Sequence, residues 1–141
     1  MTDLIGIWTY RSFVNTPAAV ETPDAALALI FGEGELAILA ADPTDGFRAT
    51  LSFGGAAIMD LVGEVIAPDG DRPLVATARG RGRAGSPISD FAYDYLFYAV
   101  PAWPDGIDQR PALVGTVIRA RDHGAATKGV TASTITVRRD P

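Results

Sequence analysis

The sequence has no cysteine and a single histidine among its 141 residues. The lack of cysteine excludes disulfide bonds, thiolate nucleophiles and the zinc or iron–sulfur sites that cysteine builds. The one histidine, His123, cannot form an ordinary transition-metal site without further ligands of its kind. There is also no glycine-rich phosphate loop that leads into a helix, which is the usual nucleotide site. We therefore expect a protein that works without a cofactor.

Positive charge and long apolar runs are also scarce. The 12 Lys and Arg residues against 17 Asp and Glu residues give a net charge of −5, so the broad basic surface that nucleic acid requires is missing. Every apolar run is short and interrupted by glycine, proline or charge, so none can cross a bilayer as a helix. The first residues lack the basic region of a secretory signal. These absences predict a cytoplasmic protein with no nucleic-acid or membrane partner.

Hydrophobic residues, by contrast, are plentiful, at 48% of the chain against 21% charged residues. The length suits one domain over residues 1–141 with one core. The apolar excess is high for a monomer whose outer face must meet water. We therefore expect a homo-oligomer, such as a homodimer, that buries a second apolar face between subunits.

The hydrophobic residues are arranged as strands. Segments rich in Val, Ile, Leu, Thr and aromatic residues recur between clusters of Gly, Pro and Asp, which is typical of sandwiches and barrels, and helical periodicity is nearly absent. Nine strands are predicted, of which eight could be real: Ile5–Val14, Ala26–Phe31, Glu35–Ala41, Phe47–Phe53, Ala57–Ile66, Leu74–Arg79, Phe91–Val100, Ala112–Arg121 and Ala132–Arg139.

Tight turns are predicted between most of these strands. Gly32-Glu33-Gly34 and Gly54-Gly55 supply positive φ, and two Pro–Asp–Gly clusters at 43–46 and 68–71 are turn formers. Short sequential hairpins make neighbouring strands antiparallel and favour an up-and-down barrel over two packed sheets. Two longer connections, 15–25 and 101–111, are where a lid or binding residues would lie, or they merely cap the barrel.

The two ends of the chain carry a motif of known barrels. Gly6-Ile7-Trp8 lies on the first predicted strand, and Arg138-Arg139 lies on the last. This combination resembles the calycins, the lipocalin and avidin group. The resemblance implies that Trp8 plugs the closed end of an eight- or nine-stranded barrel and that Arg138 or Arg139 covers the indole with a cation–π contact. It also implies that the long first loop acts as a lid.

Aromatic residues are concentrated on one predicted strand. Because side chains alternate between faces, Phe91, Tyr93, Tyr95 and Phe97 share one face and Asp94 lies on the other. The stripe either fills the core, lines a ligand site or packs against a partner. If it faces inward, the predicted ligand-binding residues are Trp8, Tyr10, Tyr93, Tyr95, Phe97 and, on a lid, Trp103.

Charged side chains offer fewer candidates. Asp94 is the best catalytic candidate, and only if the protein is an enzyme, because burial in a lumen would raise the pKa of a carboxyl toward working pH. Asp60 and Glu64 share one face of their strand, either in the lumen or in solvent. The arginines of 79–83 alternate with glycine and either grip an anion from a strand or form a solvated loop. His123 is expected in a surface turn.

Three functions remain open at this point. The protein binds a small apolar or aromatic molecule inside the barrel. Alternatively, it is a cofactor-independent enzyme, such as a cyclase, isomerase or lyase, that uses a lumenal carboxylate or tyrosine. In the third alternative it is an interaction module whose aromatic stripe forms a dimer face. Whether the stripe faces inward decides among them.

Overall fold

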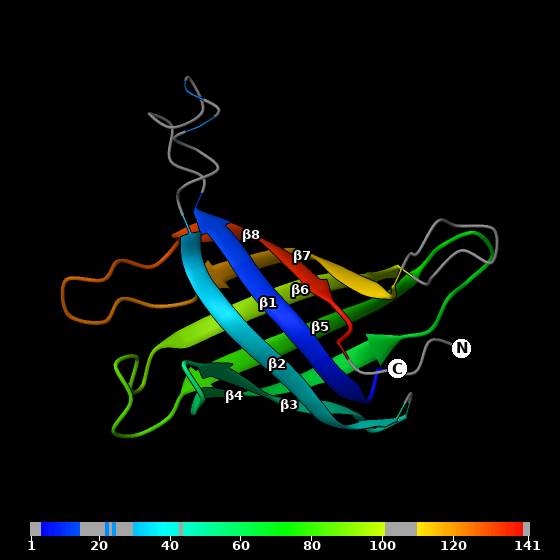
Figure 1. Ribbon diagram of the computed structural model, residues 1–141, viewed down its shortest axis with the longest axis horizontal. Helices are drawn as coiled ribbons and strands as arrows, with labels where there is room; N and C mark the ends of the chain where they lie inside the picture. The colour runs from blue at the N-terminus through cyan, green and yellow to red at the C-terminus, as the bar shows by residue number, and fades with distance from the viewer. Residues whose placement is uncertain are drawn as a thin grey trace.

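The computed structural model describes residues 4–14, 22, 24, 30–42, 44–100 and 110–139. The described chain has an all-β fold in which eight antiparallel strands close into a barrel (Figure 1). The strands are β1 (Gly6–Val14), β2 (Ile30–Asp42), β3 (Gly46–Phe53), β4 (Ala56–Ile66), β5 (Leu74–Gly82), β6 (Ala92–Val100), β7 (Ala112–Arg119) and β8 (Thr131–Val137).

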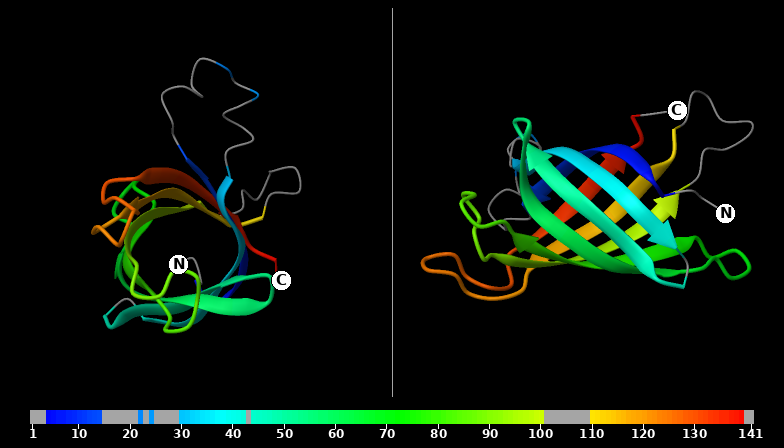
Figure 2. Two further views of the ribbon diagram at one scale, coloured as in Figure 1. Left: turned by 90° about the vertical axis from the view of Figure 1, so that its left-hand side faces the viewer. Right: turned by 90° about the horizontal axis from the view of Figure 1, so that it is seen from below.

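The strands follow one another around the barrel in chain order. Each pairs with the next, and β8 pairs back with β1 from Arg11↔Ile135 to Val14↔Ala132, which closes the ring that Figure 2 shows end-on. Closure matters physically because an open sheet would leave unpaired N–H and C=O groups at its edges. The predicted all-β, up-and-down barrel is therefore confirmed. Within the described residues, no helix has the length and hydrophobicity needed to span a bilayer.

The main difference from the prediction lies in β2. The expected turn at Gly32-Glu33-Gly34 does not exist: β2 runs through it and pairs with β1, for example at Arg11↔Glu33. Neither glycine has a positive φ, and both instead lie under the Phe53 ring, where a side chain would clash. The two predicted strands of this region are thus one, which gives eight strands; residues 26–29 lie outside the described part. The Gly54-Gly55 turn is confirmed, with φ of 60° and 85°.

The barrel interior is filled at one end and hollow at the other. Side chains alternate inward and outward along every strand, and the inward set includes Tyr93, Tyr95 and Phe97 of β6. The end at which β1 begins is packed solid around Trp8. The end at which β1 finishes contains a cavity of about 170 Å³, called here the lumen cavity. The aromatic stripe is therefore buried and cannot form a dimer face.

Candidate functional site

The closed end of the barrel is built on Trp8. Its side chain is completely buried, and its Nε1 donates a hydrogen bond to the carbonyl of Leu4 at 3.1 Å. The Arg138 guanidinium lies 5.6 Å from the indole ring centre and donates through Nη2 to the carbonyl of Ile5 at 2.8 Å. Arg139, the other candidate for this cover, instead pairs with Glu35 at 2.6 Å. Arg138 is therefore the residue that covers the plug.

The lumen cavity lies at the opposite end. It is lined by residues of six strands and of the connection between β5 and β6: Tyr10, Ser12, Phe31, Gly32, Leu51, Phe53, Ile58, Met59, Ile88, Phe91, Tyr93, Tyr95 and Arg119. Most of this surface is aromatic or aliphatic, with four hydroxyl groups and one guanidinium. Among these lining residues none carries a carboxylate. The wall can therefore hold an apolar body and a few polar atoms.

The structure brings together half of the predicted ligand-binding residues. Tyr10, Tyr93 and Tyr95 line the lumen cavity. Phe97 stacks beneath Tyr95 with ring centres 5.4 Å apart, and Trp8 lies at the closed end, so both belong to the packed core. Trp103 lies outside the described residues.

Tyr10 and Tyr95 form the floor of the cavity. Their rings meet edge to face at 6.4 Å, and the Tyr95 hydroxyl donates to Met59 Sδ at 3.6 Å. Burial raises the pKa of Tyr95 well above its usual value. Burial also raises the pKa of Tyr10, although hydrogen bonds to Tyr95 and Ser12 offset part of that rise. At neutral pH both are protonated phenols, which can donate hydrogen bonds to a ligand but cannot act as bases.

The buried phenols predict a loss of stability in alkaline solution. Unfolded tyrosines lose their protons near about pH 10, whereas folded Tyr10 and Tyr95 keep theirs to higher pH. The folded state then holds more protons than the unfolded state, so the free energy of unfolding is unaffected below about pH 10 and falls above it. Urea unfolding at about pH 8 and about pH 11 measures this slope. Tyr95→Phe should reduce this loss of stability between the two pH values. An equal loss in that variant would mean that the Tyr95 phenol is not its source.

The predicted carboxylates all lie outside the barrel. Asp94 and Glu64 are exposed and line a shallow hollow on the outer face of β4 to β6 together with Arg79. The carboxylate of Asp94 is therefore on the wrong side of β6 to reach a molecule in the lumen cavity. Asp60 is also exposed and pairs with Arg83. A lumenal acid or base supplied by these residues has no support in the geometry.

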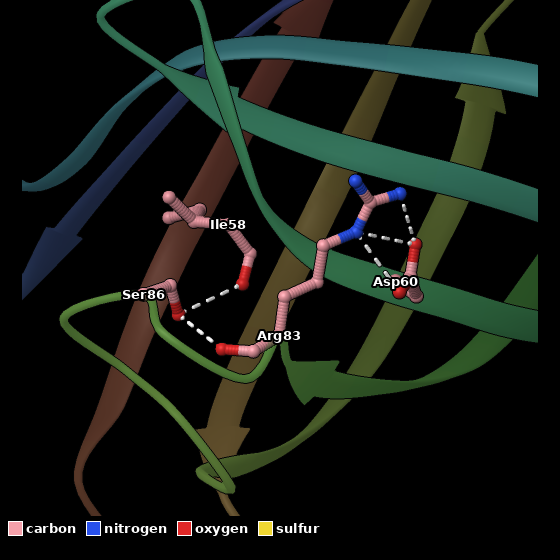
Figure 3. Close-up of polar contacts among 4 residues, drawn as sticks. All are labelled: Ile58, Asp60, Arg83 and Ser86. Carbon is pink, nitrogen blue, oxygen red and sulfur yellow. Dashed lines mark hydrogen bonds and ion pairs between the residues drawn. The ribbon is translucent and has the colours of Figure 1, made fainter.

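The Asp60–Arg83 pair anchors the connection between β5 and β6 (Figure 3). The Arg83 guanidinium binds the carboxylate through Nε at 3.0 Å and Nη2 at 2.7 Å, and the Arg83 N–H donates to the carbonyl of Ile58 at 2.8 Å. The Ser86 hydroxyl donates to the Arg83 carbonyl at 2.7 Å. This anchoring fixes the start of the segment that brings Ile88 to the lumen cavity. Arg79 and Arg81 belong to β5 and are exposed. They therefore lie on a strand and not in a solvated loop.

Arg119 is the site residue that sequence reasoning missed. It closes β7, and its guanidinium carbon lies 5.7 Å from the ring centres of Phe31 and Phe91 and 5.9 Å from that of Tyr93. A signal for it did exist, because Arg119 is in phase with the inward-facing Leu113 and Val117. His123, exposed in the connection after β7 as expected, contacts this cluster, with its ring centre 4.3 Å from that of Phe91 and the two rings tilted by 38°.

The chain matches no family model, and comparison with curated proteins and with solved structures also gives no match. Within the described residues, no three His, Asp or Glu side chains gather as they would around a metal ion. The lumen cavity, with its aromatic wall and neutral phenols, is the feature on which a function can be argued.

Proposed function

We propose that the protein binds one small apolar or aromatic molecule in the lumen cavity. The observation that carries this proposal is the hollow end of an otherwise solid barrel, walled by aromatic rings and by phenols that burial keeps protonated. The volume of about 170 Å³ is close to that of an apolar protein cavity, on the order of 150 Å³, that holds one benzene molecule. The expected ligand therefore has a body about the size of one aromatic ring.

We further propose that the barrel is of the calycin type. The support is the contact between Arg138 of the C-terminal segment and the buried Trp8 of β1, which is the arrangement that the resemblance implies. In this arrangement one barrel end is permanently closed, and only the other end is free to take up a molecule. The position of the lumen cavity at that other end agrees with the proposal.

Binding is favoured over catalysis by the chemistry of the wall. An enzyme that moves protons needs a group whose pKa lies near the working pH. The described lining has no carboxylate, and burial moves the pKa of Tyr10 and Tyr95 away from neutrality. What the wall offers is shape, aromatic surface and neutral donors, which suit recognition.

The chain has a convenient reporter of binding, because Met1 and Met59 are its only methionines and Met59 lines the cavity. With 13C-methyl methionine, single-ring probes such as toluene, benzyl alcohol and benzamide should shift the Met59 signal saturably and leave Met1 unchanged. We expect Kd values on the order of a millimolar or tighter for bodies of this size. Met59→Leu assigns the signal.

A filled cavity provides the contrast. Ile88→Trp places a larger ring at the cavity wall and should weaken binding of every probe about tenfold or more, because the probe and the indole compete for the same space. Ile66→Trp is the matched control, since Ile66 is 59% exposed on the outer face of β4. Probes that leave the Met59 signal of the wild type unmoved, or that bind Ile88→Trp as well as Ile66→Trp, would refute the proposed site.

A further inference from the structure

The lumen cavity contains one feature that a purely apolar ligand would not need. Arg119 is the only cationic side chain among the described residues that line it. A guanidinium keeps its positive charge at any ordinary pH and is costly to withdraw from water unless its charge is balanced. In the described part of the chain, no carboxylate lies within ion-pair distance of Arg119. The charge beside the cavity thus lacks a counter-charge from the described residues.

The hydrogen bonds of Arg119 are also incomplete. Its Nη1 donates to the carbonyl of Thr127 at 3.1 Å, whereas its Nε is buried and has no hydrogen-bond partner. The edge formed by Nε and Nη2 therefore makes no bond to the described residues. Buried donors in proteins are nearly always paired, so an unpaired one calls for an acceptor from elsewhere.

Arg83 shows what that edge binds in this same protein. Its Nε and Nη2 hold the carboxylate of Asp60 at 3.0 and 2.7 Å, the side-on fork that guanidinium and carboxylate form (Figure 3). At Arg119 the corresponding edge is unoccupied by any described acidic residue. The two arginines thus differ in their partner, and only Arg119 lines a cavity.

The aromatic rings around Arg119 hold it without using its donors. Phe31, Phe91 and Tyr93 each lie within 6 Å of the guanidinium carbon, at 5.7, 5.7 and 5.9 Å, so the cation is attracted to their faces. Such contacts orient the guanidinium without using its hydrogen-bond donors, of which Nη1 alone is bonded, to Thr127. The result is an oriented guanidinium, with an unpaired Nε, in the wall of a ring-sized apolar space.

From this arrangement we infer that the ligand is a small monocarboxylate. Its carboxylate pairs with Nε and Nη2 of Arg119, and its body, one aromatic ring or a branched chain of similar size, fills the space beside Tyr10, Met59 and Tyr95. The inference rests on the proposed function, because it assigns the polar end of the molecule that the lumen cavity binds.

The test compares two probes of nearly equal shape, benzoate and benzamide. Isothermal titration calorimetry and the Met59 methyl signal give the Kd of each. We expect benzoate to bind the wild type about tenfold or more tightly than benzamide, because a charge-assisted fork replaces neutral hydrogen bonds. In Arg119→Gln the benzoate Kd should rise about tenfold or more, while the benzamide Kd changes by less than about threefold.

Two further variants sharpen the comparison. Arg119→Lys keeps the charge without the fork and should retain part of the preference for benzoate, and it replaces Arg119→Gln if that variant does not fold. Arg79→Gln removes an exposed arginine from the outer face of β5 and should leave both Kd values unchanged. Raising the salt concentration should weaken benzoate more than benzamide in the wild type.

The possible outcomes separate this inference from the proposed function. If benzamide and benzoate bind equally and Arg119→Gln changes neither Kd, the carboxylate assignment is overturned while the lumen site stands. If Arg79→Gln weakens benzoate as much as Arg119→Gln does, the preference reflects general surface charge, and the assignment is again overturned. If neither probe moves the Met59 signal, both the proposed function and the inference fail.

Discussion

Replacing Trp8 by alanine is expected to lower the free energy of unfolding by about 3–5 kcal/mol. The indole is completely buried at the closed end of the barrel, where few neighbouring groups can move into the space that it would leave. Its N–H group also donates to the carbonyl of Leu4, which would lose its partner, and the cation–π contact with Arg138 would disappear. All of these losses destabilise the folded state at the closed end of the barrel.

Urea unfolding followed by circular dichroism measures this effect, since the substitution removes a fluorophore. Val62→Ala serves as the control, because Val62 is 62% exposed and its truncation should change the free energy of unfolding by less than about 0.5 kcal/mol. Trp8→Phe retains a buried aromatic ring, so its free energy of unfolding should lie between those of Trp8→Ala and Val62→Ala. A Trp8→Ala variant no less stable than Val62→Ala would mean that the indole does not plug the barrel.

The residues that share one face of a strand were largely predictable from the sequence. Alternation placed Tyr93 and Tyr95 on one face of β6 and Asp94 on the other, and the structure has that arrangement. Alternation alone could not say which face points inward, because it separates the side chains into two sets without identifying the set that faces the core. That choice depends on barrel closure, in which each strand must present its bulkier apolar face to seven other strands.

The lumen cavity could not be predicted in the same way. Its volume depends on how side chains from several strands leave space between them, which no local pattern encodes. Arg119 was not among the predicted site residues for a different reason: arginine is usually exposed, so its phase with the inward-facing Leu113 and Val117 did not mark it as a lining residue. An inward-phase charge near a strand end is the sequence signal that pointed to the site.

Gly34→Ala is expected to lower the free energy of unfolding by about 3 kcal/mol, because Gly34 lies within β2 and not in the turn that the sequence predicted. A Cβ atom at this position would lie 2.0 Å from the carbonyl oxygen of Ser52 and 2.3 Å from Phe53 Cδ1. The Ser52 oxygen belongs to the backbone of β3, which is paired with β2 at Glu35↔Ser52, so it cannot move away without disturbing the ladder. The glycine is needed for close approach and not for a turn.

Gly32→Ala is the matched comparison, two residues earlier on the same strand. Its Cβ would meet Phe53 Cζ at 2.7 Å, and Cζ is the far end of a ring that borders the lumen cavity and can swing into it. We therefore expect a smaller cost, about 1 kcal/mol, together with a shift of the Met59 methyl signal as the ring enters the cavity. Urea unfolding of the two variants gives the difference directly.

The comparison discriminates between two accounts of the glycine pair. If Gly32 and Gly34 instead supplied the positive φ of a turn, each alanine variant would lose a similar amount of stability, on the order of 1–2 kcal/mol, because a left-handed backbone disfavours a Cβ atom. If β2 is continuous and packed against β3, the backbone contact at Gly34 must cost more than the ring contact at Gly32. The order of the two free energies, more than either value, therefore tests whether this segment is the single strand that closes the barrel wall beside the lumen cavity.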